Sequence, residues 1–73
     1  MLSKDDASAK YFVKTKAGID IWITQEEFDE VMEYYNPEII PTHFVELDGN
    51  IVEAINGIEF IASKEEYENS TKI

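Results

Sequence analysis

The sequence predicts an α+β domain in which one amphipathic helix packs on one face of an antiparallel sheet of four or five strands. Three observations predict this fold: a capping signal that opens one helical stretch, an alternating apolar run before it, and short β-like runs after it. At 73 residues the chain is one domain. We expect a flexible N-terminal arm (1–9), the α+β domain (10–62), and a short polar tail (63–73).

The first two strands are expected to form a β-hairpin, with residues 11–15 and 19–23 joined by a three-residue loop. Gly18 would take the left-handed position of that loop. A two-residue loop would separate the isoleucines from their apolar partners, so the pattern favours the longer one. The predicted pairs are Thr15 with Ile19, Val13 with Ile21 and Tyr11 with Ile23 on the inner face, and Lys14 with Asp20 and Phe12 with Trp22 on the outer face.

A helix is predicted within residues 23–36, because Thr24 and Glu27 have the spacing of a capping box and Asn36-Pro37 is a stop signal. At about 100° per residue, apolar and acidic residues separate onto two faces. The predicted inner face is Phe28, Val31, Met32 and Tyr35, and the predicted outer face is Glu26, Glu27, Asp29, Glu30 and Glu33.

The second half of the chain predicts a β-meander. The prolines of 37–41 indicate a connector, and Asp-Gly and Asn-Gly are strong hairpin-turn signals. Apolar residues occupy both alternating positions, so the register stays open. The expected elements are a strand at 42–47, a turn at 48–49 or 48–50, a strand at 51–55, a turn at 56–57, a strand at 58–62, and one frayed helical turn after the capping-box pattern of 63–66.

The charge is strongly acidic and unevenly placed. Sixteen acidic residues face six lysines and no arginine, which gives a formal net charge of −10. Four lysines and three aspartates up to Gln25 sum to +1, whereas two lysines and thirteen acids from Glu26 onward sum to −11. Such a chain is repelled by nucleic acid and by anionic membranes, so its expected partners are basic protein surfaces.

Enzymatic chemistry is not expected. The chain has no cysteine, and its single histidine, His43, has no second histidine to complete a zinc set. The serines lack a nucleophile-elbow pattern, and no glycine-rich loop could cradle a phosphate. Asp48-Gly49-Asn50 lacks the ligand spacing of a calcium loop and favours a turn. We therefore expect neither a metal nor a cofactor, and the absence of a signal-peptide pattern favours a cytoplasmic protein.

The acidic helix face is the more specific signal, because like charges at i,i+4 cost a helix a few tenths of a kcal/mol per pair. The bland interpretation is a solvated face on an acidic protein. The functional one is a docking face that imitates a nucleic-acid backbone, since carboxylates about 5 to 6 Å apart can occupy lysine and arginine sites meant for phosphates. Tyr34 beside this face and the aromatic pair Phe12 and Trp22 are further candidate contacts, and each also has a bland interpretation as a packed side chain.

The segments KAGIDIWITQEEFDEVMEYY and HFVELDGNIVEAINGI carry the patterns I-x-I-T-x-E-x-F and F-x-E-x-[DN]-G-N-I-[IV]. Over about residues 10–61 the chain resembles small acidic proteins encoded by phages and prophages of Gram-positive bacteria. The resemblance implies a phage origin, for which host takeover and inhibition of host defence are typical roles. It carries no functional residues across.

The expected function is therefore that of a non-enzymatic inhibitor or modulator whose acidic helix docks on a basic, nucleic-acid-binding site of a host protein. The candidate contacts are Glu26, Glu27, Asp29, Glu30, Glu33, Tyr34, Phe12 and Trp22. The alternative is a structural or homodimeric module that buries its open sheet face. A salt-insensitive dimer at micromolar concentration would favour the alternative.

Overall fold

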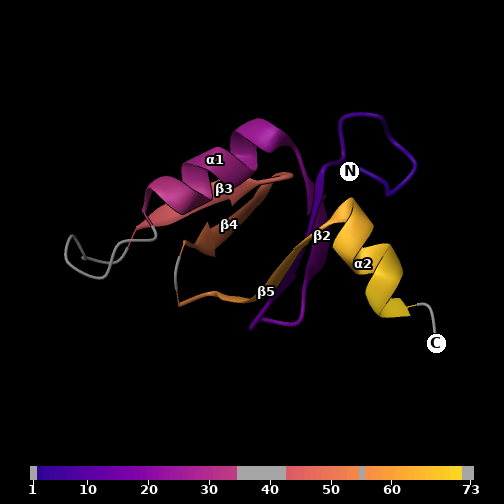
Figure 1. The fold of residues 1–73 in the computed structure, drawn as a ribbon. Helices are drawn as coiled ribbons and strands as arrows, with labels where there is room; N and C mark the ends of the chain where they lie inside the picture. Colours follow the sequence, from indigo (N-terminus) through magenta and orange to yellow (C-terminus); the bar gives the residue numbers. More distant parts are fainter. Residues whose placement is uncertain (1, 35–42, 55, 72–73) are drawn as a thin grey trace.

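The computed structural model describes residues 2–34, 43–54 and 56–71. The described residues form five strands and two helices (Figure 1). In chain order they are β1 (Tyr11–Thr15), β2 (Asp20–Ile23), α1 (Gln25–Glu33), β3 (Phe44–Leu47), β4 (Asn50–Glu53), β5 (Ile58–Ser63) and α2 (Lys64–Thr71). The α+β class is confirmed, but the prediction of one sheet and one helix is wrong. The described strands form a three-stranded antiparallel sheet, β2-β1-β5, and a separate two-stranded sheet, β3-β4.

The hairpin of β1 and β2 has the predicted register, with Val13 opposite Ile21 and Phe12 opposite Trp22. Gly18 takes the left-handed conformation in the loop, at φ +88°. Val13 and Ile21 are buried, whereas Phe12 and Trp22 are half-buried on the other face. The alternation of side chains along paired strands therefore separates an inner aliphatic face from an outer aromatic one.

The turn between β3 and β4 settles the register that the sequence leaves open. Asp48 and Gly49 both have positive φ, at 50° and 81°, as a two-residue hairpin turn of type I′ requires. Leu47 therefore pairs with Asn50, and Val45 pairs with Val52. The register buries Val45, Leu47 and Val52 and turns Phe44 and Ile51 outward.

The predicted hairpin at Asn56-Gly57 is wrong. Gly57 lacks the positive φ of a type I′ turn; instead its amide donates to the Glu53 carbonyl at 3.0 Å, which closes a single helical-type turn. A side chain on Gly57 would come within 2.8 Å of that carbonyl, so glycine is required by close approach. This turn redirects the chain, and β5 pairs with β1 instead of β4. Pairing with β1 places Ile61 opposite Val13 against the core.

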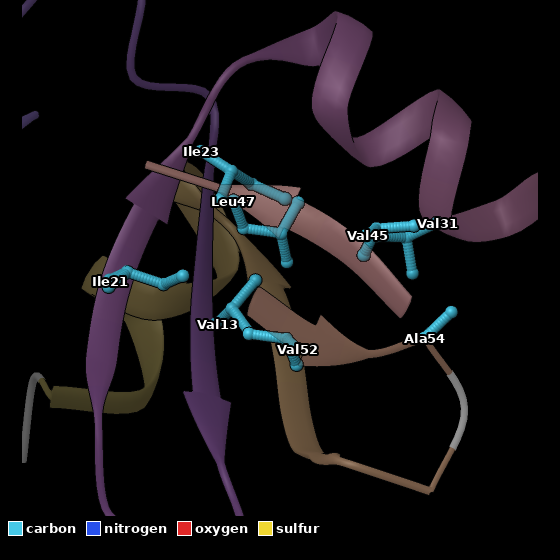
Figure 2. Packing of buried hydrophobic residues seen from close by; sticks show 8 residues of the cluster. All are labelled: Val13, Ile21, Ile23, Val31, Val45, Leu47, Val52 and Ala54. Atoms are coloured by element: carbon cyan, nitrogen blue, oxygen red, sulfur yellow. The ribbon is translucent and has the colours of Figure 1, made fainter. Parts of the chain in front are cut away.

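The core lies between the inner faces of the two sheets and α1 (Figure 2). Val31 is the fully buried residue that α1 contributes. Met32, predicted to be in the core, is 38 % exposed. The Tyr34 amide bonds the Val31 carbonyl at 3.1 Å, which tightens the end of α1 toward 3₁₀ geometry, and half-buried Tyr34 packs against the core. Tyr35, the connector 37–41 and Ile55 lie outside the described residues.

The second helix is longer than the predicted frayed turn. Ser63 and Glu66 form the capping box, and α2 continues for eight residues. It packs against β1 and β5, and Tyr67 lies against Phe12 and Trp22 on the outer face of the three-stranded sheet. Tertiary packing of this kind stabilises a helix that is too short to be stable alone.

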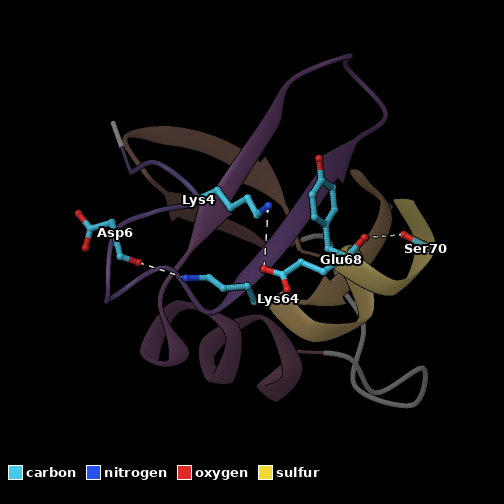
Figure 3. A network of polar contacts seen from close by, with 6 residues as sticks. Lys4, Asp6, Lys64, Glu68 and Ser70 are labelled. Carbon is cyan, nitrogen blue, oxygen red and sulfur yellow. Dashed lines mark hydrogen bonds and ion pairs between the residues drawn. The ribbon is translucent and has the colours of Figure 1, made fainter. Parts of the chain in front are cut away.

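The N-terminal residues contact both halves of the fold. The Leu2 amide donates to the Asp48 carboxylate at 3.1 and 3.2 Å, beside the β3–β4 turn. Toward α2, Lys64 donates to the Asp6 carbonyl at 3.3 Å, and Lys4 lies 3.9 Å from the Glu68 carboxylate (Figure 3).

Candidate functional site

The exposed carboxylates of α1 form one acidic surface, which consists of Glu26, Asp29, Glu30 and Glu33. The Gln25 side-chain amide donates to Asp29 at 3.0 Å and leaves the rest of these oxygens toward solvent. Among residues 2–34, 43–54 and 56–71, one ion pair is present, and it joins Lys4 to Glu68 beside α2. The charge of the acidic surface is therefore not balanced by a lysine of the described chain.

Glu27, predicted to be a member of the docking face, has a structural role. One of its carboxylate oxygens accepts from the Thr24 amide at 2.9 Å and the other from the Asp48 amide at 2.9 Å. The Thr24 hydroxyl accepts from the Glu27 amide and completes the predicted capping box. Glu27 thus joins the start of α1 to the β3–β4 turn and is half-buried there.

Packing holds α1 along its length. Phe28 stacks on Tyr11 of β1, with ring centroids 3.7 Å apart and an interplanar angle of 6°. Val31 enters the core one turn later. The acidic surface is consequently presented by a helix with a defined orientation, because rotation about the helix axis would remove both apolar contacts.

Tyr34, the predicted anchor beside the acidic residues, lies at the end of α1. Its ring stacks on His43 with centroids 4.3 Å apart and packs against the core cluster. Tyr34 is therefore half-buried, and its ring joins the end of α1 to His43, the residue before β3.

Phe12 and Trp22 form the predicted cross-strand pair, with ring centroids 5.4 Å apart. Tyr67 of α2 completes an aromatic trio, at 4.8 Å from Phe12 and 5.1 Å from Trp22. The Lys4 ammonium lies 5.8 Å from the Tyr67 ring centroid. This trio is on the opposite face of the three-stranded sheet from the core, so it is not part of the acidic surface.

Sequence reasoning missed Tyr67, and it missed Phe44 and Ile51, which at 63 % and 67 % are the most exposed large apolar residues of the described chain. The signal for Tyr67 is its place four residues after the capping residue Ser63, where an apolar side chain often accompanies a capping box. For Phe44 and Ile51 the signal is the two-residue turn, because it places both on the same face of the hairpin.

Among the described residues no three or more His, Asp or Glu side chains lie together in a way that could hold a metal ion. No helix of the described chain has the length and apolarity needed to cross a membrane. The sequence matches no family model, and neither a curated protein nor a solved structure matches it.

Proposed function

We propose that this protein is a non-enzymatic binding protein whose acidic surface docks on a basic, nucleic-acid-binding site of another protein and blocks that site. The observation that carries the proposal is the set of exposed carboxylates on one firmly packed helix, without a lysine partner in the described residues. A site built to bind phosphates offers clustered lysine or arginine side chains. Carboxylates on residues three or four apart, whose Cβ atoms lie about 5 to 6 Å from each other, can pair with those cations.

Two physical points support docking over simple solubility. Glu26 with Glu30 and Asp29 with Glu33 are like-charge pairs at i,i+4, and each costs the helix a few tenths of a kcal/mol that a lysine would have regained. The contacts of Phe28 and Val31 also orient the helix before binding, so less conformational entropy is lost when a partner engages it.

The resemblance to small acidic phage proteins suggests the setting. We place the proposed partner among host proteins of the bacterial cytoplasm that handle nucleic acid. Blocking such a protein would serve host takeover or protection from host defence.

The test compares affinity capture by the native chain with capture by two variants of equal charge. The first carries Glu26→Gln, Asp29→Asn, Glu30→Gln and Glu33→Gln. The matched control carries Asp5→Asn, Asp20→Asn, Glu59→Gln and Glu65→Gln, which are exposed positions outside α1. Both variants move the net charge from −10 to −6, because each loses four acids.

We expect the α1 variant to lose a basic partner that the native chain and the control retain. The retained complex should weaken as salt rises from 0.1 to 1 M, because the screening length falls from about 10 to about 3 Å. Equal retention by both variants would show that the partner does not read the acidic surface.

The alternative, a self-associating module built on Phe12 and Trp22, gains less support. Tyr67 of the same chain already packs on that pair. Sedimentation at micromolar concentration separates the two ideas, since the proposed function expects a monomer.

A further inference from the structure

The outward side of the β3–β4 hairpin is a second surface that the proposed function does not use. The register places four alternating side chains on it, opposite the face that carries Val45 and Val52. This outer hairpin face consists of Phe44, Glu46, Ile51 and Glu53.

Its apolar and acidic residues lie on different diagonals. Phe44 pairs with Glu53, and Glu46 pairs with Ile51. Phe44 and Ile51 are therefore diagonal neighbours, within reach of each other across the strands, and one glutamate flanks them on either side. The pattern is a short apolar stripe with a carboxylate on each flank.

The apolar stripe is well exposed, and the buried residues on the opposite face of the hairpin fix its orientation. Phe44 and Ile51 are 63 % and 67 % exposed, while Val45 and Leu47, which alternate with Phe44 along β3, are buried in the core. Turning Phe44 inward would require a one-residue slip that exposes both of those residues. The apolar stripe is thus held on the surface by the packing of the opposite face.

The flanking charges select the occupant. No lysine lies on this face, and Glu46 is exposed. One carboxylate oxygen of Glu53, Oε1, accepts from the Asn56 side-chain amide at 3.0 Å, and that bond does not use the second oxygen. A second copy of the chain would bring two further glutamates toward these two and carries the same charge of −10, so self-association is repelled.

We propose that the outer hairpin face binds a basic amphipathic helix of a partner protein. The apolar stripe of that helix would lie along Phe44 and Ile51, and lysine or arginine residues bordering the stripe would reach Glu46 and Glu53. The proposal is independent of the acidic surface, because α1 packs on the inner side of the hairpin through Val31.

The test uses a blocked helical peptide of leucine and lysine, about fourteen residues long, with leucine at i, i+3, i+4 and i+7. Its control has glutamine in place of leucine and the same charge. Binding to the full chain is measured by titration, and amide chemical shifts locate the site. The variants are Phe44→Thr with Ile51→Thr, Glu46→Gln with Glu53→Gln, and, as the matched control, Ile19→Thr with Phe60→Thr, which removes two other exposed apolar residues.

We expect the leucine peptide to change the amide chemical shifts of β3 and β4. Its affinity should fall by at least about tenfold in the Phe44/Ile51 variant and by less in the Glu46/Glu53 variant. The Ile19/Phe60 control should keep the native affinity. The glutamine peptide should bind weakly.

The proposal is overturned if both peptides bind equally and the shifts map to α1, since this would be charge attraction alone. It is also overturned if the native chain forms a dimer that Phe44→Thr with Ile51→Thr abolishes. The α1 variant described above retains this face, so failure of one proposal is distinguishable from failure of the other.

Discussion

Helices α1 and α2 begin with the same local device and join the rest of the protein in different ways. In α1 the capping residue is Thr24 and its partner is Glu27; in α2 they are Ser63 and Glu66. In both boxes the capping hydroxyl accepts from the backbone at 3.2 Å. Beyond the box, Glu27 also accepts from the Asp48 amide, whereas Glu66 is exposed on the surface.

Helix α1 is also packed more firmly than α2. Val31 of α1 is fully buried, and Phe28 stacks on Tyr11. The contact of α2 with the sheet centres on Tyr67, which is only half-buried. A capping box therefore starts a helix, but contacts distant in sequence decide how firmly the helix is held.

The largest expected effect comes from the core side of α1. Val31→Ala removes two buried methyl groups and leaves a cavity, so we expect the free energy of unfolding to fall by about 2 kcal/mol. Urea unfolding measures this. Met32→Ala on the same helix is the control, because Met32 is exposed and the change should stay within about 0.5 kcal/mol. Equal losses of unfolding free energy at the two positions would mean that α1 does not pack on the core through Val31.

A smaller effect should separate the two capping boxes. Glu27→Gln turns one carboxylate oxygen into an amide N–H that faces a backbone donor of Thr24 or Asp48, so we expect a loss of about 1 to 2 kcal/mol. Glu66→Gln can still accept from the Ser63 amide at an exposed site and should cost clearly less than Glu27→Gln. Urea unfolding gives both values. Hydrogen exchange at the Thr24 amide or at the Asp48 amide should accelerate in the Glu27 variant and at neither amide in the Glu66 variant. Unchanged exchange at both amides in the Glu27 variant would show that Glu27 does not join α1 to the β3–β4 turn.

The parts predictable from sequence are those set by neighbours in the chain. The capping box of Thr24, the register of Phe12 with Trp22, and the left-handed Gly18 all follow from short-range chemistry. The exposure of Glu26, Asp29, Glu30 and Glu33 also follows from the helical period, because charged residues opposite an apolar stripe face solvent. The inward role of Glu27 does not follow from it, because its partner, the Asp48 amide, is 21 residues away in the chain.

The remaining features depend on long-range competition. Asn56-Gly57 matches a hairpin signal, yet β5 gains more by pairing with β1, where Ile61 reaches the core opposite Val13. Local pattern does not contain that alternative. The exposure of Met32 is a second case: the helical period places it beside Phe28 and Val31, but the residue of α1 that packing buries is Val31.

The smallest expected effect is a pH response confined to α2. The Ser63 amide, and to a lesser extent its hydroxyl, hold the pKa of the Glu66 carboxyl below its ordinary value of 4.5. The unfolded helix therefore binds the Glu66 proton more tightly, so the stabilisation from this cap is complete above about pH 4.5 and is lost as pH falls through the lowered pKa.

Trp22 lies 5.1 Å from Tyr67 of α2 and reports the loss. We expect its fluorescence emission to shift to the red below pH 4.5, before the core unfolds. Asp6 must be treated in parallel, because the Ser8 amide lowers its pKa and its carbonyl accepts from Lys64 of α2. The comparator is therefore Glu66→Gln in an Asp6→Asn background, which should lack the early shift. If the shift persists there, another carboxyl controls α2 and the cap is not the pH-sensitive group.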